Sequence, residues 1–184
     1  LPAGQGAYPI LARREGDLAQ AGIILATSGG SVRRLSERAE TPGEVLDLTL
    51  DRRIGAVAPL TEHPVERQHV IRLTGDHELY RWRLDLPTGD RRGRLPVKAG
   101  ERVELTFSNA TNMSHPMHLH GHVFQLVAID GRRFSGPLRD SILVPPAAAV
   151  TVAFDADNPG EWELHSNHLY HRLAGMSALL TYTV

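Results

Sequence analysis

The chain has 184 residues, of which 41% are hydrophobic, and its formal net charge is −1. This length suits one or two domains with a sizeable core, and the balanced charge gives no electrostatic reason to expect nucleic acid or a membrane as a partner. The absence of cysteine excludes disulfides and thiolate metal sites. No apolar run approaches the roughly 18 residues that span a bilayer, and no signal-peptide pattern opens the chain.

Alternating apolar and polar residues predict strands along most of the chain. In chain order, the patterns occur in AGIILAT, VLDLTL, HVIRLT, LYRWRL, RVELTFSN, VTVAFDA and SALLTYTV. Turn-forming segments such as TGD, KAGE, IDGR and DNPGE separate them. Strands at this spacing predict an all-β sandwich or barrel. Only HLYHRLAG is expected to hold a short helix.

A change of composition at GAVAPLTEHPVERQ, residues 55–68, predicts a linker. The part that follows has the size and strand number of one complete sandwich, whereas the part before it has about three expected strands, too few for an independent core. We therefore expect residues 1–66, which include the linker, to be the closing strands of a preceding domain or to pack on the following one, and residues 67–184 to be a complete domain. Because the chain begins with Leu1 and not Met, we also expect that a leader or larger N-terminal part has been removed.

Histidine is concentrated in two windows: seven of the ten histidines lie in residues 115–122 and 165–171. On a strand, His118, His120 and His122 would point the same way, with neighbouring Cα atoms about 6.6 Å apart. This spacing suits two neighbouring metal ions better than one. His115 would lie on the other side of the strand, so that one segment can serve two sites.

The second window repeats this arrangement, because His165 would lie on one side while His171 and Met176 reach another site after a turn. Imidazole ligands suit Cu, Zn, Fe and Ni, and a nearby thioether favours copper. Within the first window, His122 is the expected non-ligand. The scattered histidines are expected to be surface or core residues; these are His63, His69 and His77.

The two windows resemble the motifs of multicopper oxidases, the laccase-like and copper-resistance proteins. HPMHLHGHVF is similar to the H-P-x-H-L-H-G-H-x-F pattern of their C-terminal cupredoxin domain, and GEWELHSNHLYHRLAGM is similar to G-x-W-x-x-H-C-H-x-x-x-H-x-x-x-G-M. The resemblance covers about residues 67–184 and implies a Greek-key cupredoxin β-sandwich, preceded by the end of another cupredoxin domain. It implies copper, oxidation of phenolic or metal-ion substrates with reduction of O₂ to water, and a periplasmic or extracellular location.

The resemblance also implies roles for individual residues. It assigns the type 1 copper to two imidazoles and a weak axial thioether: His115, His171 and Met176. It assigns three further imidazoles to part of the trinuclear cluster. His118 would bind the type 2 copper, and the type 3 pair would be bound by His120 and His165. The remaining ligands of that cluster come from H-x-H pairs in N-terminal cupredoxin domains, which are therefore the implied partners, in the same protein or as a separate chain.

Two positions depart from the family pattern at its centre. The cysteine of the family is Ser166 here, and the histidine after it is Asn167. Without the thiolate, the site would bind Cu(II) weakly and would lack an intense thiolate band. His168 is a further candidate ligand, but it comes one residue late, and on a strand its side chain would point to the opposite face unless a bulge re-aims it.

Three explanations of these departures are open: natural decay, natural change compensated by His168, and deliberate near-isosteric replacement. The favoured function is the C-terminal part of a multicopper oxidase with impaired activity. The alternative is a non-catalytic copper-binding or structural cupredoxin module. A generic zinc-binding β-sandwich is the third possibility.

Overall fold

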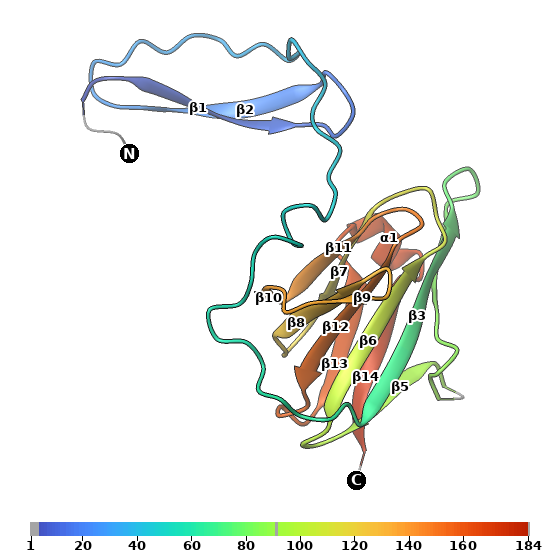
Figure 1. Cartoon of the computed structure of the whole chain (residues 1–184). Coiled ribbons are helices and arrows are strands. Elements are labelled where there is room, and N and C mark those ends of the chain that lie inside the picture. The colour runs from blue at the N-terminus through green and yellow to red at the C-terminus, as the bar shows by residue number, and fades with distance from the viewer. Residues whose placement is uncertain (1–3, 91, 184) are drawn as a thin grey trace. The chain divides into compact units, whose positions relative to one another are not determined.

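The computed structural model describes residues 4–90 and 92–183, and it divides the chain into two compact units, Leu1–Leu46 and Asp47–Val184 (Figure 1). The smaller unit contains an antiparallel hairpin of β1 (Ala7–Arg13) and β2 (Gln20–Ala26). Among the described residues, the helix is far too short to cross a membrane, and no other segment forms a spanning helix.

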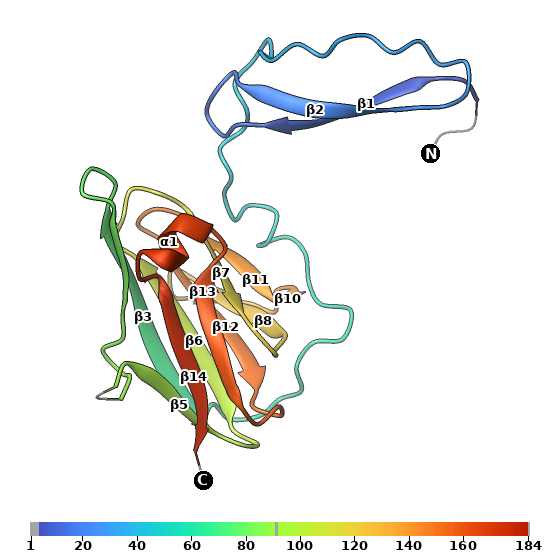
Figure 2. The ribbon, with the colours of Figure 1, turned by 180° about the vertical axis from the view of Figure 1, so that it is seen from behind.

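The larger unit is a sandwich of two sheets, which both views show as two layers (Figures 1 and 2). The first sheet has the order β10-β8-β12-β6-β3-β4, with β9 on β8, and consists of β3 (Arg67–Asp76), β4 (Arg81–Asp85), β6 (Arg102–Asn109), β8 (Phe124–Ile129), β9 (Arg132–Arg133), β10 (Leu138–Arg139) and β12 (Ala149–Asp155). The second sheet has the order β11 (Ser141–Val144), β7 (His115–Leu119), β13 (Glu161–Ser166), β14 (Ser177–Thr183) and β5 (Arg94–Lys98). The helix α1 (Leu169–Leu173) connects β13 to β14.

The predicted all-β, Greek-key cupredoxin sandwich is confirmed, and so is the short helix in HLYHRLAG. The strand predicted at VLDLTL was wrong, because residues 45–50 form a loop that ends in a turn. Only Leu48 of this segment reaches the core. The Asp47 carboxylate accepts hydrogen bonds from the backbone N–H and the hydroxyl of Thr49, at 2.8 and 2.6 Å. Such local bonds favour a turn over a strand ladder.

The core follows the alternation of the strands. In β6, the side chains of Val103, Leu105 and Phe107 are fully buried between the sheets. The charged residues between them face the other side of the sheet, yet Arg102 and Glu104 are also buried, with 6% and 4% exposure. Apolar burial of this kind stabilises by about 25 cal/mol per Å² removed from water.

The predicted linker covers part of this charged face. The carbonyl of Thr61 accepts a bond from Arg102 Nη1 at 3.1 Å, and the N–H of Leu60 donates to Gln125 Oε1 at 2.9 Å. Residues 47–66 therefore belong to the larger unit in space. That residues 1–66 close a preceding cupredoxin domain stays a prediction.

Candidate metal centres

Strand β7 carries histidines on both of its faces, and its pairing with β13 brings further candidate residues to each face. His165 lies opposite His118, and Ser166 lies opposite Met117. Because directly opposed residues share a face and neighbours along a strand alternate, His118 and His165 point to one side while His115 and Ser166 point to the other. The structure therefore places the histidines of this one segment on two faces.

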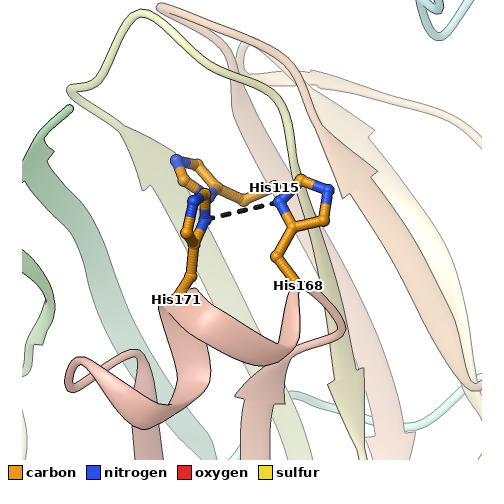
Figure 3. A group of neighbouring side chains, drawn as sticks. All are labelled: His115, His168 and His171. Atoms are coloured by element: carbon orange, nitrogen blue, oxygen red, sulfur yellow. Dashed lines mark hydrogen bonds between the residues drawn. The ribbon is translucent and has the colours of Figure 1, made fainter. Parts of the chain in front are cut away.

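The inner cluster consists of three imidazoles, His115, His168 and His171, whose rings converge (Figure 3). His171 Nδ1 lies 3.3 Å from His115 Nδ1 and 3.3 Å from His168 Nδ1. The indole of Trp82, on β4, stacks on the ring of His171 with centroids 4.2 Å apart. Aromatic packing thus covers the cluster on the side of β4.

His168 joins this cluster although strand alternation would turn it away. The reason is that β13 ends at Ser166, two residues earlier. His168 is the N-cap of α1, with φ −72° and ψ 103°, so strand alternation no longer applies to it. Residues three apart on a helical turn are neighbours, which places His168 beside His171.

Burial keeps these imidazoles neutral. The pKa of His115 is lowered to about 4, mainly by burial, with the neighbouring rings of His171 and His168 contributing in the same direction. Burial also lowers the pKa of His171 to about 4, with His168 and His77 contributing in the same direction. The pKa of His168 is lowered by burial as well. Neutral imidazoles have a free nitrogen lone pair, the form that binds metal ions.

The outer cluster consists of His118, His120 and His165. His120 Nε2 lies 2.8 Å from His165 Nε2, and the rings of His118 and His120 have centroids 4.8 Å apart. His118 Nδ1 lies 2.7 Å from the carbonyl of Asp140, and His165 Nδ1 lies 3.0 Å from the carbonyl of Ser166. Because a carbonyl only accepts, both Nδ1 atoms carry the proton and both Nε2 atoms have free lone pairs.

The two departures from the family motif lie on different faces. Ser166 is fully buried on the inner face, and its Oγ accepts a bond from the N–H of His168 at 3.2 Å. Asn167 is exposed; its backbone N–H donates to the carbonyl of Pro116 at 2.8 Å, and its amide nitrogen lies 3.5 Å from Ser141 Oγ. Ser141 Oγ also contacts His118 Nδ1, at 3.0 Å. Asn167 therefore lies on the side of the outer cluster.

Met176 and His122 also belong to the two motifs, and hydrogen bonds hold each of them in position. Met176 is fully buried; its N–H donates to the carbonyl of His171 at 2.9 Å, and its carbonyl accepts from the N–H of Ser166 at 3.0 Å. The ring of His122 bonds the carbonyl of His120 at 3.0 Å and the hydroxyl of Tyr182 at 2.7 Å. Both nitrogens of His122 are thus engaged, as a structural histidine requires.

Sequence reasoning missed the residues that support the ligands. Thr111 Oγ1 lies 2.8 Å from His115 Nε2, and no motif marks this threonine. Glu163 lies near His120 and His165, but its carboxylate is bound by Arg172 Nε at 2.8 Å and by Ser177 Oγ at 2.7 Å. An alternating strand predicts which residues face the cluster, and it gives no signal for a partner in a loop.

The donors fit copper in part. Metal–nitrogen bonds are about 2.0–2.1 Å long, so the 3.3 Å between the Nδ1 atoms of His115 and His171 allows both to bind one ion. The hydroxyl at Ser166 does not fit a blue-copper centre, which needs a thiolate. The outer cluster supplies three imidazoles, a ligand type that suits copper among other ions.

Comparison with known proteins gives one family. A family model described as multicopper oxidase matches residues 62–183. The multicopper oxidase MmcO of Mycobacterium tuberculosis is 33% identical over 98% of this chain and 35% of its own length. A copper resistance protein A homolog of Pseudomonas syringae is 34% identical over 58% of this chain and 18% of its own length. The laccase of Botrytis aclada shares the fold, with a TM-score of 0.66 and 17% identity over 88% of this chain and 36% of that one. The chain thus spans about a third of the length of its M. tuberculosis relative.

Proposed function

Because the chain belongs to the multicopper oxidase family, we propose that it is the C-terminal copper-binding part of an oxidase that takes electrons from phenolic or metal-ion substrates and reduces O₂ to water. The observation that carries this proposal is the pair of histidine clusters on the two faces of β7. We place the oxidase in the periplasm or outside the cell, the location that the resemblance implies.

The proposed ligands divide between the two clusters. His115 and His171, with Met176 as the axial ligand, would hold the type 1 copper. Part of the trinuclear cluster would be held on the outer face by His118, His120 and His165. When bound, copper at these places supplies the one-electron oxidation of the substrate and the reduction of O₂.

The surrounding residues orient and shield these ligands. Trp82 stacks on His171 and shields its ring from solvent. The backbone carbonyls of Asp140 and Ser166 hold the outer rings in the tautomer whose Nε2 is free. Second-sphere bonds of this kind typically change metal affinity by about 10–100-fold when removed.

Activity is proposed to be impaired, because Ser166 and Asn167 replace the sulfur and one imidazole between the two clusters. A hydroxyl is a hard donor that couples weakly to copper, whereas thiolate sulfur favours Cu(I). Position 166 is still bonded through the backbone to His165, but the side-chain donor atom at this position is oxygen and not sulfur.

The remaining ligands are proposed to come from N-terminal cupredoxin domains, in the same protein or as a separate chain. The hairpin of the smaller unit supports a missing neighbour, because Ile10 and Ile23 are 52% and 61% exposed and face each other in register. A two-stranded hairpin is marginally stable alone, so we expect it to complete a sheet of that preceding domain.

The test uses the chain assembled with the domains that precede it in its gene. We expect Ser166→Cys to produce an intense visible band on copper loading. Adding Asn167→His should raise O₂ uptake with a phenol or Fe(II) by at least about tenfold, equivalent to about 1.4 kcal/mol of activation free energy. Ser31→Cys, in the smaller unit, adds a thiol elsewhere and should produce neither effect. A copper-loaded double variant that consumes no O₂ would refute the oxidase and favour a non-catalytic copper-binding module.

A further inference from the structure

We propose that His115, His168 and His171 form a three-imidazole site that binds one divalent ion of the Cu²⁺ and Zn²⁺ class through their Nδ1 atoms, with His168 in the place that a sulfur ligand would take. This site is the inner cluster, where the proposed function places the type 1 copper, so the inference rests on that proposed function. Its test reads metal binding and not turnover, so that either proposal can fail without the other.

Two of the three distances between the donor atoms match those around a single ion. With metal–nitrogen bonds of about 2.0–2.1 Å and tetrahedral angles, two ligand nitrogens lie about 3.3–3.4 Å apart. His171 Nδ1 lies 3.3 Å from Nδ1 of each of the other two rings. All three donor atoms lie within 4.8 Å of one another.

Hydrogen bonds alone cannot account for this packing. A ring nitrogen of a neutral imidazole presents either one N–H or one lone pair in the ring plane. His171 Nδ1 faces two other nitrogens, so a single hydrogen bond satisfies one of the two contacts. A metal ion between the rings would accept all three lone pairs at once.

A chain of hydrogen bonds gives His115 the tautomer that a metal ligand needs. The amide nitrogen of Asn109 donates to the carbonyls of Met113 and Val144, at 2.7 and 2.9 Å, which fixes the orientation of that amide. Its Oδ1 therefore faces Thr111, whose hydroxyl donates to it at 2.8 Å.

The hydroxyl of Thr111, having given its hydrogen to Asn109, is an acceptor for the ring of His115. His115 Nε2, 2.8 Å away, must then carry the proton. The Nδ1 atom is left with a lone pair that points at His171. A ligand histidine that donates its second nitrogen to a buried acceptor is the usual second-sphere pattern of metal sites.

Ser166 is already engaged and leaves the third place to His168. Its Oγ accepts the N–H of His168 at 3.2 Å, where the chain turns from β13 into α1. His168 is exposed whereas His115 and His171 are buried, so that the ion would be reachable from solvent on one side. Three protein nitrogens and an open fourth position are the coordination of a solvent-accessible zinc or copper(II) site.

The donor set selects the ion. Three imidazoles without thiolate favour borderline divalent ions, and affinity should follow the order Cu²⁺ above Zn²⁺. Bound Cu²⁺ should be pale, because the intense colour of a blue centre needs the sulfur ligand. Cu⁺ should be held more weakly than at a site with thiolate.

The experiment titrates the metal-free chain with Zn²⁺ and Cu²⁺ by calorimetry, in a His118→Ala/His120→Ala background that removes the outer cluster. We expect one ion per chain. His168→Ala and Thr111→Val should each weaken Zn²⁺ binding, the threonine change by about 10–100-fold. Thr111→Ser, which keeps the hydroxyl, should retain the affinity, and His63→Ala, at an exposed histidine, is the matched control.

Imidazole ¹⁵N spectra of the unsubstituted chain give a reading that does not depend on the folding of variants. Zinc should shift the Nδ1 signals of the three rings of the site. Zinc-induced shifts confined to His115 and His171, or a His168→Ala chain that binds Zn²⁺ as tightly as its background, would overturn the site. Strong blue colour of the copper-loaded natural chain would overturn it as well.

Discussion

The ring of His115 is fully buried, and its two nitrogens have different partners. Nε2 contacts Thr111, whereas Nδ1 faces the ring of His171. Placing buried imidazoles side by side is tolerated only while they remain uncharged, because a buried charge is costly unless it is paired. The cluster is therefore sensitive to protonation as well as to metal.

The metal-free chain should lose stability as the pH falls from about 6.5 to about 4. Burial lowers the pKa of His115 and of His171 to about 4, whereas an unfolded histidine titrates near 6.5. Between these values the unfolded chain binds more protons, so that stability rises with pH. The neutral histidines contribute their full share to the free energy of unfolding above about pH 6.5. As the pH falls from there to about 4, the free energy of unfolding should decrease by an amount on the order of 1–3 kcal/mol.

Urea unfolding of the metal-free chain at a series of pH values measures this dependence. His115→Gln should flatten the slope, because it removes one of the titrating groups, and Tyr170→Phe on the exposed side of α1 should leave the slope as it is. A stability that is constant across the interval would contradict the neutral buried cluster.

At the scale of single elements, the turn after β7 is built around Gly121. This residue has φ +70°, and a Cβ added to it would lie 2.5 Å from the indole of Trp162. The N–H of the preceding residue, His120, donates to the carbonyl of Glu163 at 3.0 Å. The turn therefore presses the end of β7 against β13 and determines where the His120 ring lies.

Gly121→Ala should destabilise the chain by about 2–3 kcal/mol, because a left-handed backbone and a clash with Trp162 act together. Gly131→Ala is the matched control: Gly131 has φ +75° but nothing within 4 Å of its added Cβ. It should cost about 1 kcal/mol. Chemical denaturation of both variants measures the free energy of unfolding. Equal decreases in the two variants would show that the contact with the indole does not contribute to stability.

Strand periodicity predicted six of the described strands, which are β2, β3, β4, β6, β12 and β14. The histidine spacing predicted that His115 and His118 point to opposite faces of β7. Period-two patterns are local, so they were sufficient for strands such as β6 and β12. They failed at VLDLTL, where the hydrogen bond between Asp47 and Thr49 favours a turn over a strand. They also failed at His168, because its orientation depends on where β13 ends. The contact of Thr111 with His115 is tertiary and has no periodic signature.

For the whole molecule, the segment from residue 47 to 66 links the sandwich to what precedes it and also packs on it. Leu48 is 5% exposed within the core, and Asp51 pairs with Arg139 at 2.7 Å. Thr61 and Glu66 bond Arg102, which also pairs with Asp155. A change of composition predicted a linker at residues 55–68, and composition carries no information about packing.

A chain reduced to residues 47–184 should keep the stability of the larger unit. A chain reduced to residues 67–184 should lose at least about 2 kcal/mol, since burial of one leucine alone contributes about that much. Leu48→Ala in the longer truncation isolates the contribution of this leucine. Thermal unfolding of the three chains tests the boundary, and equal melting temperatures for both truncations would show that the segment is only a connector.

The alternation of ligands along β7 limits how the gene can change in length. One residue inserted between His115 and His118 would exchange the two faces beyond the insertion and would turn His118 toward the core. Two inserted residues would restore the faces but move the later donors about 6.6 Å along the strand. The stretch of the gene that encodes β7 therefore tolerates no gain or loss of codons between His115 and His118.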